Sequence, residues 1–271
     1  MVQATDGPCK TVPVAGALPS YQEWPAGGSL SESVACLWVA RRGEDQSNDD
    51  PVLPDACIDI LWDGASLSVA GPDTGPAPIV WRQSGYFAGV RFRPGRAPST
   101  LGVPASAIVD QRVELETLWG RHSTAELTDR LAAASDPEAA AEMLGHAVAD
   151  RASAAAPADP VVAGLVALLL DSINAAGSRA GAVRAASVAL SIGERRLHRR
   201  CAAAVGYGPK TLERILRFQR ARQLAGRSTT TLAAVAADAG YADQSHFVRE
   251  CHRLAGTTPS DLFKTAAGVA P

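Results

Sequence analysis

Long apolar segments are missing from this chain of 271 residues. A membrane-spanning helix needs roughly 20 consecutive apolar residues, and the longest apolar run, residues 161–170, is far shorter. The first ten residues also have no basic segment followed by an apolar core, which is the pattern of a secretory signal. We therefore expect a cytoplasmic protein with no membrane partner.

Cysteine is scarce and irregularly spaced. No C-x-x-C pair occurs, and an odd number of thiols does not suit a disulfide framework, so we expect reduced thiols and no metal site. The last two cysteines fall at apolar positions of helical patterns, where a thiol usually acts as a small buried hydrophobe. The five residues are Cys9, Cys36, Cys57, Cys201 and Cys251.

The motifs of common enzyme classes are absent as well. The sequence contains no G-x-S-x-G, no P-loop and no dinucleotide-binding fingerprint, each of which has a mechanical role in catalysis or phosphate binding. A hydrolase would also need a nucleophile, a base and an orienting acid together. The acidic half offers only His122 and His146, both in a predicted helical segment. We therefore expect no enzyme and no cofactor.

What is present is a division of charge within a chain of ordinary globular composition. Residues 1–177 carry 11 Lys and Arg against 22 Asp and Glu, whereas residues 178–271 carry 15 against 6. Such asymmetry predicts an acidic domain joined to a basic one whose first candidate partner is nucleic acid. The alternative is a basic helical bundle used for protein contacts.

Residues 1–114 have the pattern of short strands. Residues 57–62 alternate, with Ile58, Ile60 and Trp62 on one face, and Asp63-Gly64 follows as a hairpin turn signal. Further short strands punctuated by Gly and Pro predict a small antiparallel β barrel or sandwich. The fold class is therefore α+β, with this β domain followed by helices and then by an all-α domain.

Residues 115–177 change to a helical period. Asp136-Pro137 and Asp159-Pro160 each combine an N-cap residue with proline at the first helical position. The apolar run 161–170 offers more hydrophobic surface than a helix packed on one side needs. We expect this segment to link the domains and to form a homodimer, the alternative being an interdomain core helix.

Residues 178–271 contain two helix–turn–helix patterns separated by a linker helix at about 209–224. In each pattern the second helix has two inward apolar positions, and polar side chains that suit DNA bases face outward near its N-terminus. These outward candidates are Arg195, Arg196, His198, Arg199, Gln244, Ser245, His246 and Arg249. On the linker helix, Arg214, Arg217 and Arg220 are candidates for phosphate contacts.

These stretches closely resemble the AraC-type (AraC/XylS) DNA-binding domain over residues 183–263. The most diagnostic match is residues 236–247, AADAGYADQSHF, and the others are residues 193–201, 205–210, 217–221 and 256–263. The resemblance implies two helix–turn–helix units bridged by a linker helix in a transcriptional regulator that binds double-stranded DNA, with RNA polymerase as a further candidate partner. Cys201 and Cys251 stand where the family usually has Phe.

The first domain resembles an uncharacterised sensor domain found on such regulators, in residues 54–62 (PDACIDILW), 89–95 and 101–104. The resemblance implies a small-molecule effector without naming it. Aromatic residues could line its cavity or form the core, and charged ones could orient a ligand or pair on the surface. The candidates are Trp38, Asp59, Trp62, Trp81, Tyr86 and Arg91.

A rival interpretation from another class is a DNA-repair protein that accepts methyl groups on a zinc-bound cysteine. Such a site needs four thiolates, two usually in close spacing. Only Cys9, Cys36 and Cys57 precede the basic domain, and they are 27 and 21 residues apart. The sequence therefore favours a ligand-responsive regulator.

Overall fold

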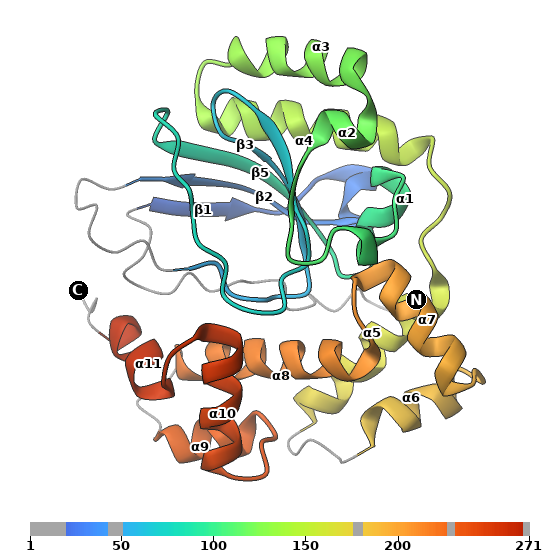
Figure 1. Cartoon of the computed structure of the whole chain (residues 1–271), viewed down its shortest axis with the longest axis vertical. Coiled ribbons are helices and arrows are strands. Elements are labelled where there is room, and N and C mark those ends of the chain that lie inside the picture. The colour runs from blue at the N-terminus through green and yellow to red at the C-terminus, as the bar shows by residue number, and fades with distance from the viewer. Residues whose placement is uncertain (1–19, 43–50, 176–180, 227–230, 268–271) are drawn as a thin grey trace.

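The structure of the chain, a computed structural model, describes residues 20–42, 51–175, 181–226 and 231–267. Figure 1 shows two bodies stacked along the long axis, a sheet backed by helices and, below it, a helical body. Strands dominate the first part of the chain and helices the second, as the α+β expectation requires. No helix in the described ranges is both long and apolar enough to cross a bilayer.

The first body is built on one antiparallel sheet. In the described part of the chain it has six strands in the order β1-β2-β5-β3-β4-β6. All neighbouring strands pair antiparallel. The strands are β1 (Ser20–Trp24), β2 (Val34–Arg41), β3 (Ile58–Trp62), β4 (Leu67–Ala70), β5 (Tyr86–Phe92) and β6 (Arg112–Glu114).

Alternation along the strands divides their side chains between two faces of the sheet. On β3, Ile60 and Trp62 join the core under the helices and have no exposed surface. Asp59 and Leu61 face the other side, where they line a cavity. The alternation predicted for this strand is confirmed.

The sheet is open, which corrects the expected barrel or sandwich. Strands β1 and β6 lie at opposite edges and do not pair with each other. Helix α4 (Pro137–Ser153) covers one face and packs on β2 and β5. Because a helical layer buries the apolar face of the sheet, neither closure nor a second sheet is needed to exclude water from it.

The other helices of the first body surround α4 and the sheet, as Figure 1 shows. Gly145 brings α4 close to the sheet, since a Cβ built there would lie 3.1 Å from a methyl carbon of Leu37. Besides α4, this body contains the 3-10 turns η1 (Gly28–Glu32) and η2 (Ala105–Ala107) and the helices α1 (Ala97–Leu101), α2 (Leu115–Trp119) and α3 (Arg121–Ala132).

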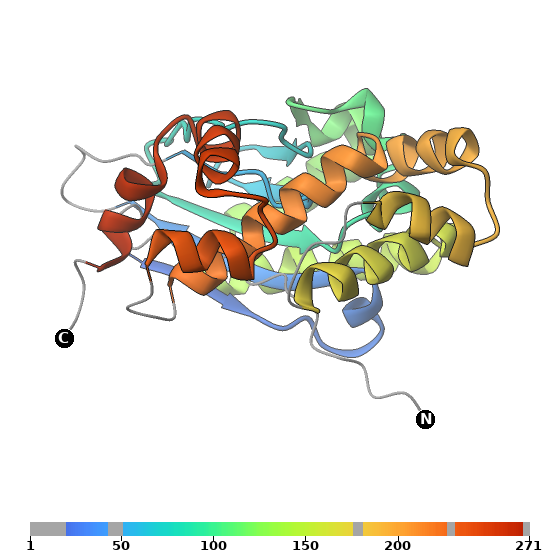
Figure 2. The same ribbon diagram turned by 90° about the horizontal axis from the view of Figure 1, so that it is seen from below.

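The second body is entirely helical within the described residues. Figure 2, seen from below, shows the long helix α8 running diagonally between two helix pairs. The elements are α5 (Pro160–Asn174), α6 (Ala182–Ala189), α7 (Glu194–Val205), α8 (Pro209–Ala225), α9 (Leu232–Asp238), α10 (Gln244–Ala255) and α11 (Pro259–Ala267).

The two Asp-Pro signals begin helices as predicted. Asp136 accepts a hydrogen bond from the backbone N of Ala139 (2.7 Å), and Asp159 accepts one from that of Val161 (2.9 Å). Asp159 also forms an ion pair with Arg200 of α7 at 2.6 Å. These N-caps satisfy backbone donors that the first helical turn leaves without partners.

The described residues of segment 115–177, which are 115–175, belong partly to one body and partly to the other. Helices α2, α3 and α4 belong to the core under the sheet, whereas α5 belongs to the core of the second body. Leu165 and Leu169 of α5 have no exposed surface, and Leu168 and Leu170 are half-buried against the same core. The apolar run that motivated the dimer therefore packs largely inside the chain.

The two bodies share a contact built from the segment before β3. Leu53 and Ala56 belong to the sheet body by chain order but are buried in the core of the helical body. Gln219 of α8 donates a hydrogen bond from Nε2 to the carbonyl oxygen of Pro54 (2.5 Å). Ala56 has φ +68°, a conformation that costs free energy for a residue with a Cβ, and this contact holds it there.

Candidate nucleic-acid interface and sensor cavity

The first helix–turn–helix unit consists of α6 and α7. Its turn is held by Ser187, whose Oγ donates to the carbonyl oxygen of Ile192 (2.5 Å). Leu197 and Cys201 of α7 are fully buried, as the pattern predicts. The outward candidates all lie on the exposed surface of α7: Arg195, Arg196, His198 and Arg199.

The second unit consists of α9 and α10. Asp243 begins α10 and accepts a hydrogen bond from the backbone N of His246 (2.6 Å), and Phe247 and Cys251 are fully buried. Gln244, Ser245 and Arg249 are the candidates that lie toward solvent. His246 is half-buried, with its ring edge-on to that of Tyr241 at 5.2 Å between centroids.

The two inward cysteines behave as small hydrophobes, which confirms their predicted packing role. Burial raises the pKa of each thiol, Cys201 and Cys251, to about 12, so both stay protonated at neutral pH. Cys36 and Cys57 are also buried, and Cys9 lies outside the described residues.

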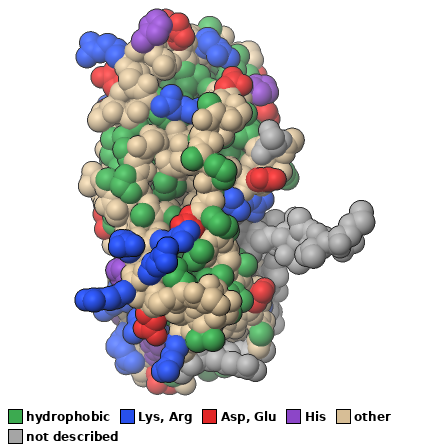
Figure 3. Space-filling model, turned by 90° about the vertical axis from the view of Figure 1, so that its right-hand side faces the viewer, with side chains coloured by type: hydrophobic (Ala, Val, Ile, Leu, Met, Phe, Trp, Pro, Cys, Tyr) green, Lys and Arg blue, Asp and Glu red, His purple; other side chains and the backbone are tan. Residues whose placement is uncertain are grey.

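The basic side chains of the helical body gather on its surface. Figure 3 shows Lys and Arg side chains collected on the lower part of one face, over this body. Arginines near the N-terminal ends of α7 and α10 present positive charge and multiple donors, which suit phosphates and the edges of guanine. The arrangement therefore presents positive charge and hydrogen-bond donors of the kinds that suit an anionic duplex.

The arginines of the linker helix have other surroundings. Arg214 forms an ion pair with the buried Glu250 of α10 at 3.2 Å. Arg217 forms one with Glu213 and lies over the ring of Tyr241, 5.8 Å from its centroid. Arg220 is half-buried. Arg214 and Arg217 thus tie α8 to the second unit.

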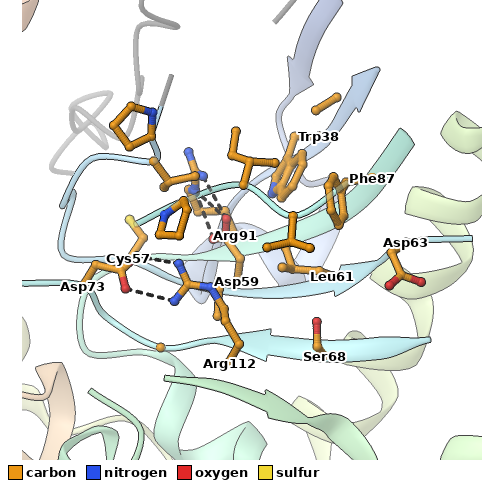
Figure 4. A pocket seen from close by; sticks show the side chains of 18 of the residues that line it. Trp38, Cys57, Asp59, Leu61, Asp63, Ser68, Asp73, Phe87, Arg91 and Arg112 are labelled. Carbon is orange, nitrogen blue, oxygen red and sulfur yellow. Dashed lines mark hydrogen bonds and ion pairs between the residues drawn. The ribbon is translucent and has the colours of Figure 1, made fainter. Parts of the chain in front are cut away.

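A cavity of about 370 Å³ lies on the face of the sheet away from α4. Figure 4 shows that it has two chemically distinct ends, with Asp59, Asp73, Arg91 and Arg112 gathered at one and Trp38, Leu61 and Phe87 at the other, where Asp63 lies beyond them. The segments 51–57 and 78–82 border it, and so does α8 through Arg222. Both bodies therefore contribute to one cavity wall.

The charged end is centred on a buried ion pair. Arg91 donates from Nε and Nη2 to the carboxylate of Asp59, at 3.0 and 2.8 Å, and lies 3.6 Å from Asp55. Burial raises the pKa of Asp59 although Arg91 opposes the shift. Burial acts to lower the pKa of Arg91, but Asp59 and Asp55 hold it well above its ordinary value.

A second ion pair and Arg222 complete the charged end. Arg112 donates from both terminal nitrogens to Asp73 at 2.9 Å. Arg222 donates from Nη1 to the side-chain oxygen of Gln219 (3.0 Å). Burial lowers the pKa of Arg222 to about 10, so this arginine stays charged at neutral pH while largely removed from water.

Four of the six candidate ligand residues line the cavity, namely Trp38, Asp59, Trp81 and Arg91. Trp62 and Tyr86 do not. They lie at the core on the other face of the sheet, where the indole N of Trp62 donates to the hydroxyl oxygen of Tyr86 (3.2 Å). The sequence does not show which face of a strand the helices cover, so it could not separate the aromatic residues of the core from those of the cavity.

Further residues that sequence reasoning missed line the cavity too. On β4, Ser68 and Ala70 both line the cavity. Period-two alternation along this strand could have indicated that Ser68 faces away from the buried Leu67 and Val69. Nothing in the local sequence could have indicated Arg222, because it reaches the cavity only through the packing of α8 against segment 51–57. Other missed residues in the wall are Tyr21, Asp55, Asp73 and Arg112.

Two units that each bury an apolar helix face and expose basic and amide side chains at a helix N-terminus define a DNA-binding protein of the double helix–turn–helix class. Residues 186–265 match the model of a helix–turn–helix domain, and residues 22–114 match that of a domain of unknown function, DUF6597. The chain thus carries an AraC-type DNA-binding domain behind a DUF6597 domain, which confirms the resemblance. The DNA-binding domain makes this chain a DNA-binding transcription regulator.

Solved structures of AraC-type regulators are similar to this chain at low sequence identity. One is an AraC-type transcriptional regulator from Chromobacterium violaceum (20% identity, 41% of this chain and 96% of that chain, TM-score 0.36). Another is ToxT from Vibrio cholerae (10% identity, 92% and 100%, TM-score 0.45). A third is wild-type ToxT with bound unsaturated fatty acid (12% identity, 82% and 91%, TM-score 0.45). No curated protein matches the chain.

Proposed function

We propose that this protein binds specific DNA sequences through α7 and α10, and that a small molecule in the cavity alters its affinity for DNA. The observation that carries the proposal is the shared cavity wall. Arg222 belongs to α8, the helix between the two DNA-binding units, and lines the same cavity as Trp38 and Arg91 of the sheet. A ligand there would contact both bodies at once.

Base reading is proposed for the outward residues of the two recognition helices. A helix that enters the major groove presents the side chains near its N-terminus to base edges. Arg pairs well with guanine and Gln with adenine. The residues assigned to this role are Arg195, Arg196, His198, Arg199, Gln244, Ser245, His246 and Arg249.

For two arginines of the linker helix we propose a bracing role in place of the phosphate contacts expected from sequence. Arg214 and Arg217 are engaged with Glu250 and Glu213, and a phosphate would have to displace a carboxylate that already lies beside each guanidinium. Arg220 is half-buried on the same helix, and for this residue we keep the phosphate contact as our proposal. RNA polymerase remains a proposed partner of the DNA-bound regulator.

Selection of bound duplexes from a random pool, with the full chain, tests the DNA-binding part. We expect enrichment of one motif with two blocks of preferred bases, one for each recognition helix, because the two helices enter separate groove segments. A pool that stays random after repeated rounds, with folded protein, would contradict sequence-specific binding.

The effector part is tested by a cavity-filling variant. Compounds that raise the melting temperature of the chain are tested for their effect on its affinity for the selected duplex. An effector must change the affinity for DNA, and DNA must change the affinity for the effector by the same factor. Ser68→Phe fills the cavity and should abolish both shifts. Ser123→Phe, the same change at an exposed position of α3, should leave them intact. Effects that survive Ser68→Phe would place the effector elsewhere.

A further inference from the structure

The aromatic end of the cavity has a flat floor. Gly89 of β5 stands opposite Trp38 of β2 in the antiparallel register. A Cβ built on Gly89 would come within 2.4 Å of the indole ring, so one face of the ring lies across the glycine. The guanidinium of Arg91 lies 5.9 Å from the centroid of the ring. Leu61 is the neighbour of Gly89 on the other strand, and it extends the apolar floor.

The indole of Trp38 carries a polar group that has no partner among the described residues. The Trp38 side chain lines the cavity and is only 7% exposed. Its N–H is buried and makes no hydrogen bond to the described residues. A buried donor without an acceptor is costly. An acceptor atom on a ligand would remove that cost, and water or ligand is the natural source of one here.

The charges of the cavity wall are largely matched within the wall, where Asp55 lies 3.6 Å from Arg91 and also attracts Arg222. Asp59 pairs with Arg91, Asp73 with Arg112, and Asp63 with the more exposed Arg82. Hydrogen bonds from Ser66 to Asp63 offset its burial and keep the pKa of that carboxyl below its ordinary value, so the pair stays ionised. A ligand therefore need not bring a charge of its own into the cavity.

Two exposed apolar side chains line the cavity. Val52 and Val80 are 40% and 72% exposed, and both belong to its wall. Large exposed apolar side chains at the edge of a concave site are typical of ligand-binding surfaces. Trp81, packed against Phe87 at 5.1 Å between ring centroids, adds an aromatic side wall.

Resting on the proposed function, we propose that the cavity takes a flat, uncharged aromatic molecule with a hydrogen-bond acceptor on its edge. The ring would lie among Leu61, Trp81 and Phe87, against the exposed edge of the indole of Trp38, and the acceptor would receive the indole N–H. The volume of about 370 Å³ lies in the range of small-molecule sites and suits two or three fused rings.

Three probes separate the requirements of this proposal. Coumarin is flat, uncharged and has a carbonyl acceptor; naphthalene is of similar size without an acceptor; octanoate is aliphatic and anionic. Calorimetric or fluorescence titration of the full chain should rank coumarin first. Coumarin should exceed naphthalene by about fivefold to tenfold, the worth of one buried hydrogen bond.

The variant Trp38→Phe keeps an aromatic floor and removes the N–H. It should weaken coumarin to the level of naphthalene while leaving naphthalene almost unchanged. Trp24→Phe is the matched control, because the indole N–H of Trp24 donates to Glu142 and the side chain packs on the helix-covered side. It should bind all three probes as the unsubstituted chain does.

Equal coumarin affinity in the unsubstituted chain and in Trp38→Phe overturns the proposal, as does tighter binding of octanoate than of coumarin. If Trp38→Phe does not fold, the ranking of the probes on the unsubstituted chain decides, and equal affinity for coumarin and naphthalene overturns the acceptor assignment. If octanoate binds and shifts the affinity for DNA, the aromatic class of ligand is wrong but the proposed function stands. If the DNA selection enriches no motif, the proposed function itself is wrong.

Discussion

Arg249 and Arg217 illustrate how surroundings separate arginines that the sequence treats alike. Arg249 lies near the start of α10 with part of its surface open to solvent, where its guanidinium can reach a groove. Arg217 is held between Glu213 and the ring of Tyr241. The first is placed for an external partner and the second for cohesion of the domain, since an Arg stem and head can also pack.

We therefore expect Arg249→Ala and Arg217→Ala to differ in kind. Arg249→Ala should cost about 1–3 kcal/mol on the selected duplex and relax preference at one or two base pairs. Arg217→Ala should instead lower the free energy of unfolding. Titration on selected and scrambled duplexes across a salt series, with urea unfolding of each variant, measures both. Equal losses on the two duplexes for Arg249→Ala would remove its assignment as a base reader.

The buried pair of Arg91 and Asp59 leads to a prediction about stability. Arg91→Met should destabilise the chain by about 3–5 kcal/mol, because a carboxylate in the sheet would lose its partner. Arg82→Met is the matched control: Arg82 pairs with Asp63 but its side chain is 60% exposed, so a change of about 0–1 kcal/mol is expected. Urea unfolding measures both, and similar losses would contradict the assignment.

Among the elements, the turns of the two helix–turn–helix units differ in backbone chemistry. Gly240 has φ +81° in the second turn, and Ser191 has φ +51° in the first. The left-handed conformation suits glycine and strains a residue that has a Cβ. The two turns therefore share a geometry but only one has the residue that fits it.

Reciprocal substitutions at these turns should have opposite effects. Gly240→Ala should lower the free energy of unfolding by about 1–2 kcal/mol. Ser191→Gly should raise it by at most about 1 kcal/mol, because relief of strain is partly offset by a more flexible unfolded chain. Denaturant unfolding gives both values. Destabilisation by Ser191→Gly would mean that backbone strain at this turn contributes little to the stability of the domain.

Asp159 connects two elements, since it caps α5 and pairs with Arg200 of α7. The hydrogen bond from Arg200 is the largest of the causes that lower the pKa of Asp159. A carboxyl with a lowered pKa in the folded state contributes stability above its unfolded pKa of about 3.9, and that contribution is lost as the pH falls through the folded value.

Asp159→Asn should keep the cap and lose the ion pair. We expect a loss of about 0–1 kcal/mol at neutral pH and a shallower decline of stability below about pH 4 than in the unsubstituted chain. Asp159→Ala should cost about 1 kcal/mol more, because the cap is lost as well. Urea unfolding at pH 7 and through the acid range tests this, and an unchanged acid slope in Asp159→Asn would contradict the pKa argument.

At the scale of the whole molecule, the packing of α5 changes the expectation of a dimer. Its apolar residues form part of the core beside α8, so the surface that motivated self-association is largely used within one chain. We expect light scattering at micromolar concentration to give the mass of one chain, 28.1 kDa, without DNA. A mass of two chains would require a surface other than the apolar face of α5.

The two bodies of the molecule also meet at one cavity, through segment 51–57. Segment 51–57 inserts Leu53 and Ala56 into the helical body and at the same time borders the cavity. A ligand that moves this segment would act on α8 through the hydrogen bond between Gln219 and Pro54. This continuity is the physical basis for the coupling proposed between effector and DNA.

Local features of this protein could be predicted from the sequence because they depend on neighbours along the chain. The Asp-Pro starts of α4 and α5, the alternation of β3 and the inward positions of Leu197 and Phe247 follow from periods and caps that span a few residues. The residue patterns of the DNA-binding units were equally local, and the family model matches there.

Tertiary packing alone decided the features that join distant residues. Pairing of β2 with β5 laid Trp38 over Gly89, the two faces of the sheet separated Trp62 from the cavity, and docking of α8 brought Arg222 to its wall. A strand pattern does not say whether a helix or another sheet will cover its apolar face, and an apolar helix such as α5 satisfies either a dimer or a core. Those choices depend on contacts between segments far apart in the chain, which no local period records.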